Sequence, residues 1–250
     1  MKFFIEEKKQ FKMDKVCSLL KGYIYRNTNL PNSILFLKKI LEETSIFIDT
    51  ITNDGRINSS LNERVILDIL LEDARLKDRI RQMDIRHWFD FQIYDYKYGW
   101  IPVNIKITTT KTADNVGNLA CCLWSIFESD MTLDKKYYNG DVSQKIVQSL
   151  KNNKLNNDHK RDYYFLVIDK TDKTDKTDKT IIINSLKGLT NLQSNLNNLP
   201  FQVRWKDNTK FKFNSIKTIR DMFIKSLIQP KKSWKEEFLM DVRAFHTTQA

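Results

Sequence analysis

The feature that most constrains the fold is a pair of short apolar segments near the middle of the chain. They read HWFDFQIYD (87–95) and WIPVNIKIT (100–108), and the residues between them include Lys97, Tyr98 and Gly99. Aromatic and β-branched runs on either side of a short turn that contains glycine are typical of two antiparallel strands. We therefore predict a β-hairpin that belongs to a larger sheet.

Two more segments have the composition of buried strands. They read DYYFLVID (162–169) and TIIINSL (180–186), and a Thr-Asp-Lys repeat lies between them. The two segments are rich in β-branched and aromatic residues, which favour strands. The repeat has no apolar residue and can bury nothing. We predict two further strands of the same sheet, joined by a solvated hairpin loop.

Amphipathic helices are predicted around these strands. Residues 33–48 and about 61–74 carry apolar side chains every three to four positions, which is the helical period. A third helix is expected at about 115–128, against one face of the sheet, and two more at 213–227 and 233–245. Strands surrounded by helices indicate an α/β fold class.

The composition favours a single domain. The 250 residues are 41% hydrophobic, and with only 6 Gly and 4 Pro no segment resembles a linker. Within this domain we expect a helical part at about 1–55, a core at about 58–130, and further strands and C-terminal helices at 160–250.

The net charge and the cysteines bear on the partner and the compartment. Lys and Arg number 42 against 31 Asp and Glu, a formal charge of +11, which attracts polyanions, most commonly nucleic acid. The alternative is a basic surface without a specific partner. Three cysteines without a C-x-x-C pair favour reduced thiols in the cytoplasm. The N-terminus lacks an apolar signal segment and no run of about 18 apolar residues occurs, so neither secretion nor membrane insertion is expected.

Polar side chains are placed at matching positions of the predicted hairpin. Because side chains alternate along a strand, Asn104 and Lys106 share one face. The hairpin brings Asp90 opposite that face, so a carboxylate, an amide oxygen and an ammonium group converge. The two kinds of oxygen are hard ligands that suit Mg²⁺, and such a metal could activate water and neutralise charge on phosphorus. The lysine could orient or deprotonate the water, or hold the phosphate.

This arrangement resembles the PD-(D/E)xK nuclease superfamily, and within it the type II restriction endonucleases. Asp90 matches the first acid of the family motif, and Asn104-Ile105-Lys106 matches its acid-x-Lys after 13 intervening residues. Phe89 stands where the family has proline, and Asn104 stands where it has the second acid. An amide at that place resembles some restriction enzymes of the superfamily.

The resemblance implies a restriction-endonuclease-like core, with a mixed β-sheet flanked by helices, and Mg²⁺-dependent cleavage of double-stranded DNA at a specific sequence. Asp90, Asn104 and Lys106 would be catalytic, and the first two would bind the metal. A homodimer is implied, because cutting both strands of a palindrome takes two sites related by a twofold axis. Three alternatives remain open: an exposed Asp90–Lys106 ion pair without catalysis, a DNA-binding protein that does not cleave, and a repair or resolving nuclease of the same fold.

Glu63 has two interpretations. The spacing Ser60-x-x-Glu63 is that of a capping box, which favours a helix cap. In the family, a glutamate on the helix before the catalytic hairpin sometimes assists the metal site, and that role would add Glu63 to the catalytic residues. Asp95 approaches the turn of the hairpin, so we expect it in solvent.

Five residues are candidate DNA contacts because they carry hydroxyl, amide or cationic groups: Thr108, Thr109, Lys111, Asn115 and Arg204. Such groups bind phosphates or base edges. The competing interpretations are that Thr112 or Asp114 caps the next helix and that Arg204 is a solvated residue of an aromatic strand.

Overall fold

The structure is a computed structural model that describes residues 30–46, 55–108, 113–116, 118–170, 179–195, 200–228 and 236–249. Several predicted features fall outside these ranges, namely residues 1–29 of the helical part, Cys17 and most of the Thr-Asp-Lys repeat. The other two cysteines, Cys121 and Cys122, are buried and free.

A mixed five-stranded sheet forms the centre of the fold. Its strands are β1 (Ile80–Gln82), β2 (Phe91–Asp95), β3 (Gly99–Thr108), β5 (Tyr164–Asp169) and β6 (Thr180–Ser185), in the order β1-β2-β3-β5-β6. The pairs β1–β2, β2–β3 and β5–β6 are antiparallel, whereas β3 and β5 are parallel. The predicted hairpin and the two further strands are therefore confirmed.

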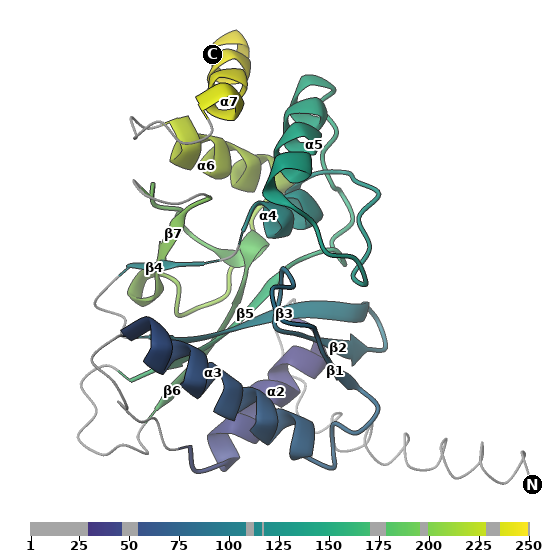
Figure 1. Cartoon of the computed structure of the whole chain (residues 1–250), viewed down its shortest axis with the longest axis vertical. Helices are drawn as coiled ribbons and strands as arrows, with labels where there is room; N and C mark the ends of the chain where they lie inside the picture. Colours follow the sequence, from purple (N-terminus) through teal and green to yellow (C-terminus); the bar gives the residue numbers. More distant parts are fainter. Residues whose placement is uncertain are drawn as a thin grey trace, which may run out of the picture.

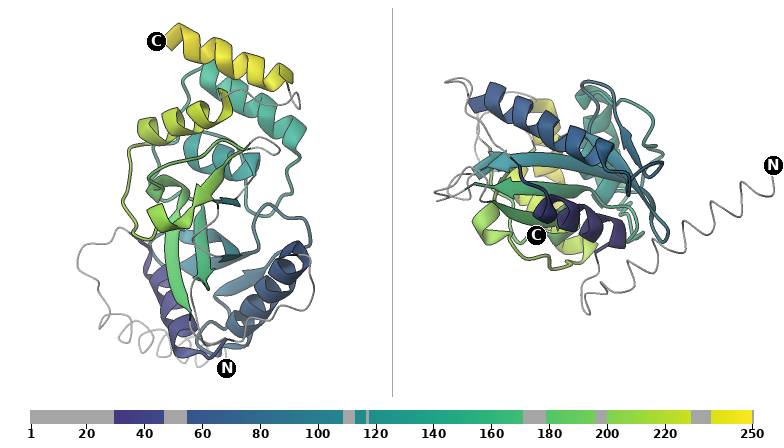
Figure 2. Two further views of the ribbon diagram at one scale, coloured as in Figure 1. Left: turned by 90° about the vertical axis from the view of Figure 1, so that its left-hand side faces the viewer. Right: turned by 90° about the horizontal axis from the view of Figure 1, so that it is seen from below.

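Helices lie on both sides of the sheet and confirm the α/β class (Figure 1). On one face, α2 (Asn32–Glu43) packs on β2 and β6, and α3 (Gly55–Glu72) packs on β1 and β3. Figure 2 shows these two helices at one end of the molecule and the remaining helices at the other. The other helices are α4 (Leu119–Ile126), α5 (Asn139–Lys151), α6 (Ile216–Ile228) and α7 (Glu236–Gln249).

The position of β5 between two cores explains why its sequence is apolar over most of its length. Alternate side chains enter opposite cores: Phe165 and Val167 pack with the α4 side, while Tyr164 and Leu166 pack with the α2 and α3 side. Both faces are covered by helices, so the strand has no solvent face and needs no polar alternation.

A second, two-stranded sheet lies beside the first. It pairs β4 (Ala113–Asn115) with β7 (Gln202–Arg204) in antiparallel register. Strands β1 and β4, each three residues long, and helix α5 were not predicted from the sequence. The aromatic strand expected around Arg204 is limited to β7.

The capping-box interpretation of Ser60 and Glu63 is wrong. Helix α3 begins at Gly55, so both residues lie in its interior. The hydroxyl of Ser59, one turn before Glu63, donates instead to Glu63 Oε1 at 3.1 Å. The helix that follows β4 is capped by Asn118, whose side-chain oxygen accepts from the backbone N–H of Cys121. Asp114 is therefore not its cap.

The expectation that Asp95 is solvated is also wrong. Its carboxylate is buried and accepts hydrogen bonds from the backbone N–H groups of Ser33, Lys97 and Tyr98. The first bond ties α2 to the hairpin, and the other two fix the turn between β2 and β3. Asp95 is thus a buried hydrogen-bond acceptor that holds α2 and the hairpin turn in place, although its position near the turn suggested an exposed side chain.

Candidate functional site

Asp90 lies directly before the first residue of β2, where β3 extends beyond its pairing with β2 and keeps only β5 as a neighbour. The N–H of Asp90 donates to the carbonyl of Val103 at 3.1 Å, the last backbone bond on this side of β3 within the described residues. Two residues further along β3, the backbone N–H of Ile105 donates to Asp90 Oδ2 at 2.7 Å. The Asp90 carboxylate therefore takes the place of the missing strand at this edge.

Asn104 donates a second hydrogen bond to the same carboxylate oxygen of Asp90. Its Nδ2 donates to Asp90 Oδ2 at 2.8 Å. This bond fixes the orientation of the amide, because a carboxylate accepts and the amide nitrogen donates. The predicted convergence of Asp90 and Asn104 is thus present in the structure.

The environment of Asp90 disfavours its charge. Burial raises the pKa of Asp90 to about 6, and the nearby charge of Glu63 acts in the same direction. The positive charge of Lys106 and the hydrogen bond from Ile105 oppose this rise in pKa. A cation bound beside Asp90 would stabilise the ionised carboxylate, since opposite charge lowers the pKa of an acid.

The amide of Asn104 is only half satisfied. The residue is 9% exposed, and its Oδ1 atom is buried with no hydrogen-bond partner among the described residues. A buried acceptor without a partner costs about 1–3 kcal/mol. Buried acceptors in folded proteins are normally satisfied by a protein group, a water or an ion. Asn104 Oδ1 is thus an oxygen available to a cation, beside an acid that would benefit from one.

Lys106 and Glu63 form an ion pair next to these residues. The distance from Lys106 Nζ to Glu63 Oε1 is 3.1 Å, and the two side chains are 23% and 21% exposed. Glu63 reaches Lys106 from α3, at the part of β3 that β2 leaves unpaired. The alternative of an exposed Asp90–Lys106 ion pair does not describe this arrangement, because Lys106 pairs with Glu63 and both side chains are partly buried.

Asp114, on β4, is an acid that the sequence analysis did not place near this site. Burial raises its pKa, whereas Thr108, Trp205 and the charge of Lys106 lower it, and the charge of Glu63 raises it. Its Oδ2 atom is buried and has no hydrogen-bond partner in the part of the chain that the structure describes. The position of Asp114 depends on the pairing of β4 with β7, which lies about ninety residues away in sequence.

The donor atoms at the site suit a hard cation. The carboxylate of Asp90 and the free Oδ1 of Asn104 are oxygen ligands of the kind that Mg²⁺ takes, together with water and phosphate oxygens. Over the described ranges, no three residues among His, Cys, Asp and Glu cluster closely enough to hold a metal ion. The residues therefore fit a cation that relies on few protein ligands, and they do not form a complete cage.

The candidate DNA contacts are scattered. Thr108 is buried at the end of β3, and Asn115 Oδ1 accepts hydrogen bonds from Asn195 and Gln202. Arg204 is partly buried on β7, and its Nε atom has no partner among the described residues. Two further candidates, Thr109 and Lys111, lie outside the described residues.

Comparison with known proteins supplies no family for this chain. No protein-family model matches the sequence, and no curated protein is significantly similar to it. Among the described helices, none combines the length and the apolar character that crossing a membrane requires.

Proposed function

We propose that this protein is a Mg²⁺-dependent endonuclease of the type II restriction class that hydrolyses double-stranded DNA at a specific sequence. The observation that carries the proposal is the buried contact of Asn104 with Asp90, which leaves Asn104 Oδ1 without a partner among the described residues. The PD-(D/E)xK motif expects an acid, a second ligand and a lysine at these three positions, and the fold provides the mixed sheet on which the motif would stand.

Each residue has a defined role in this proposal. Asp90 and Asn104 would hold the metal through carboxylate and amide oxygens. Mg²⁺ bound there would neutralise negative charge at the scissile phosphate. Lys106 would orient the attacking water or hold the phosphate through its ammonium group. Glu63, which contacts Lys106 Nζ at 3.1 Å, would set the position of that ammonium group.

The positive charge of the chain is compatible with a DNA substrate, and the proposed cleavage of both strands would require a dimer. The formal charge of +11 provides attraction to a polyanion. Each chain offers one set of these residues, and cutting both strands of a palindromic site takes two sets related by a twofold axis. We therefore propose a homodimer on DNA, with the partners double-stranded DNA and a second copy of the chain.

The test is digestion of plasmid and genomic DNA with the purified full chain and Mg²⁺, with EDTA as control. Discrete fragments with one sequence at their ends support the proposal. Cleavage confined to branched or damaged DNA indicates a repair or resolving nuclease instead. A protein that retards DNA in a gel but never cuts it is a non-catalytic DNA-binding protein, and the endonuclease proposal then fails.

A further inference from the structure

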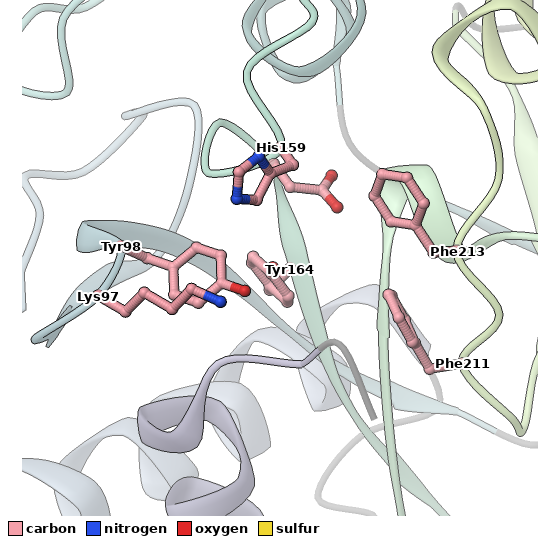
Figure 3. A pocket seen from close by; sticks show the side chains of 7 residues that line it. Lys97, Tyr98, His159, Tyr164, Phe211 and Phe213 are labelled. Atoms are coloured by element: carbon pink, nitrogen blue, oxygen red, sulfur yellow. The ribbon is translucent and has the colours of Figure 1, made fainter. Parts of the chain in front are cut away.

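A separate pocket lies at the hairpin turn, away from the polar residues of β3. It has a volume of about 290 Å³ and is lined by Lys97, Tyr98, His159, Asp162, Tyr164, Phe211 and Phe213 (Figure 3). Four of these seven residues are aromatic, and three can carry a charge. The same lining thus combines flat apolar surfaces with charged groups.

The lining of the pocket includes none of the residues of the proposed nuclease site, Asp90, Asn104, Lys106 and Glu63. Tyr164 is the register partner of Val103 and packs with it in the core beneath α2 and α3. Asn104 alternates with Val103 and so points to the other face. A ligand in this pocket would therefore bind whether or not the chain is a nuclease.

The wall formed by the hairpin turn is held in place before any ligand binds. The buried Asp95 carboxylate accepts from the N–H of Lys97 at 2.9 Å and from that of Tyr98 at 3.2 Å. Basic groups gather at the ring of Tyr98: Lys97 Nζ lies 5.2 Å from its centroid, and the ring of His159 lies 6.3 Å away. The turn thus presents the ring of Tyr98 with the ammonium group of Lys97 beside it, and the imidazole of His159 approaches the same ring from the segment before β5.

The opposite wall is also fixed. The ring of Phe211 lies so close to Gly188 that a Cβ atom there would stand 2.5 Å from it, so only glycine permits this packing. Asn214 anchors the same loop, because its Nδ2 donates to the carbonyl groups of Lys187 and Leu189. Phe213, between these anchors, keeps 42% of its surface exposed. Figure 3 shows Phe211 and Phe213 on one side of the pocket and Tyr98 on the other.

The floor of the pocket carries a buried acid. Asp162 is 2% exposed, and its Oδ1 accepts from the N–H groups of Tyr163 and Lys187 at 2.8 and 3.2 Å. The Ser185 side chain also hydrogen-bonds to this carboxylate. A carboxylate offers about four acceptor positions, so these three bonds leave about one for a ligand. The pocket is therefore aromatic at its sides, acidic at its floor and basic at its rim, where Lys97 and His159 are exposed.

We propose that this pocket binds a nucleotide, taken either as a free mononucleotide or as an unpaired nucleotide of a nucleic-acid strand. A base would stack against the aromatic rings, which accept any base through its π face. An N–H group of the base would donate to Asp162, and the phosphate would lie against Lys97 and His159. The volume of about 290 Å³ is at the small end for ligand pockets, so it suits one base and excludes a larger ligand.

The experiment measures binding to the full chain by calorimetry and by ligand-observed NMR, without Mg²⁺, so that no cleavage enters the result. The ligands are the four common mononucleotides, the matching nucleosides, inorganic phosphate and a short single-stranded oligonucleotide. Binding of a mononucleotide more tightly than of its nucleoside or of phosphate supports the proposal. Tighter binding of the oligonucleotide, with competition by the mononucleotide, identifies the strand as the source of the ligand.

Variants locate the binding. Phe213→Ser should weaken nucleotide and nucleoside binding at least about fivefold, the lower range for loss of one stacking ring. Lys97→Glu should weaken nucleotide binding but leave nucleoside binding unchanged. Matched controls at exposed residues away from the pocket, Tyr138→Ser and Lys135→Glu, should change neither affinity. The proposal is overturned if no nucleotide binds, or if Phe213→Ser and Lys97→Glu bind every ligand as the parent chain does.

Discussion

Asn104 donates its amide N–H to the buried carboxylate of Asp90 across 2.8 Å, and its own oxygen has no partner in the part of the chain that the structure describes. A second carboxylate at this position would face Asp90 directly, and two adjacent acids in a buried site cannot both ionise easily. The amide avoids this repulsion and still offers one oxygen. A site of this kind should bind a divalent cation weakly until the DNA phosphate adds negative charge.

Substitutions of Asn104 separate a metal site from a structural hydrogen bond. Asn104→Asp should lower the melting temperature in EDTA, because two acids then meet, and should recover stability on addition of Mg²⁺ or Ca²⁺. Asn104→Leu leaves Asp90 without one donor, at a cost of about 1–3 kcal/mol, and should abolish cleavage with no recovery by metal. Calorimetry of metal binding with and without DNA provides the direct readout. A fully active Asn104→Leu enzyme would remove Asn104 from the site.

The pair of Lys106 and Glu63 predicts two kinetic effects of different size. Lys106→Ala should bind DNA in Ca²⁺ but cleave about 10²-fold more slowly in Mg²⁺, the size of a general acid–base contribution. Glu63→Gln keeps a hydrogen-bond acceptor for Lys106 without the charge, so it should lose less. In the double variant, Glu63→Gln should add little to Lys106→Ala, since its effect passes through the lysine. If the losses in single-turnover assays are additive, Glu63 acts independently of Lys106. If Lys106→Ala is as active as the parent chain, Lys106 is not a catalytic residue.

The elements that the sequence predicted are those with long and regular patterns. The hairpin, β5, β6 and the C-terminal helices have enough apolar repeats to be recognised. The unpredicted strands β1 and β4 have three residues each, too few for a period of two to stand out. The start of α3 was misplaced because Ser60 and Glu63 match a capping box inside a longer helix.

The candidate site was predictable only in part. Asp90, Asn104 and Lys106 could be brought together because a hairpin register follows from local sequence. Glu63 and Asp114 approach them through contacts between elements distant in sequence, such as α3 with β3 and β4 with β7. The burial of Asp95 depends likewise on Ser33, 62 residues away. Contacts between elements that are distant in sequence cannot be predicted from local sequence patterns.

The positive charge of the chain predicts a strong dependence of DNA binding on salt. If several Lys and Arg side chains contact phosphates, each releases condensed counterions, and log Kd should rise with log salt with a slope of several units. Fluorescence anisotropy with a short duplex in Ca²⁺ measures this slope. Binding that is indifferent to salt would mean that the charge of +11 is not a DNA-binding surface.

Asp162 predicts a pH dependence of stability. Burial raises its pKa from 3.8 to about 6, although Lys187 and the hydrogen bonds to its carboxylate oppose the shift. Between these two values the folded protein holds a proton that the unfolded chain has released. Asp162 therefore contributes about 3 kcal/mol to the free energy of unfolding below about pH 4. This contribution is lost as the pH rises through about 6.

Asp162→Asn removes this titration and keeps an acceptor for the neighbouring N–H groups. Its free energy of unfolding relative to the parent chain should rise by up to about 3 kcal/mol between pH 4 and pH 7. Urea unfolding of both proteins at several pH values measures the difference, and groups common to the two cancel. Asp207→Asn, at an exposed acid, serves as control and should run parallel to the parent chain. If Asp162→Asn also runs parallel, Asp162 does not titrate in this range, and the acid at the floor of the pocket is ionised throughout.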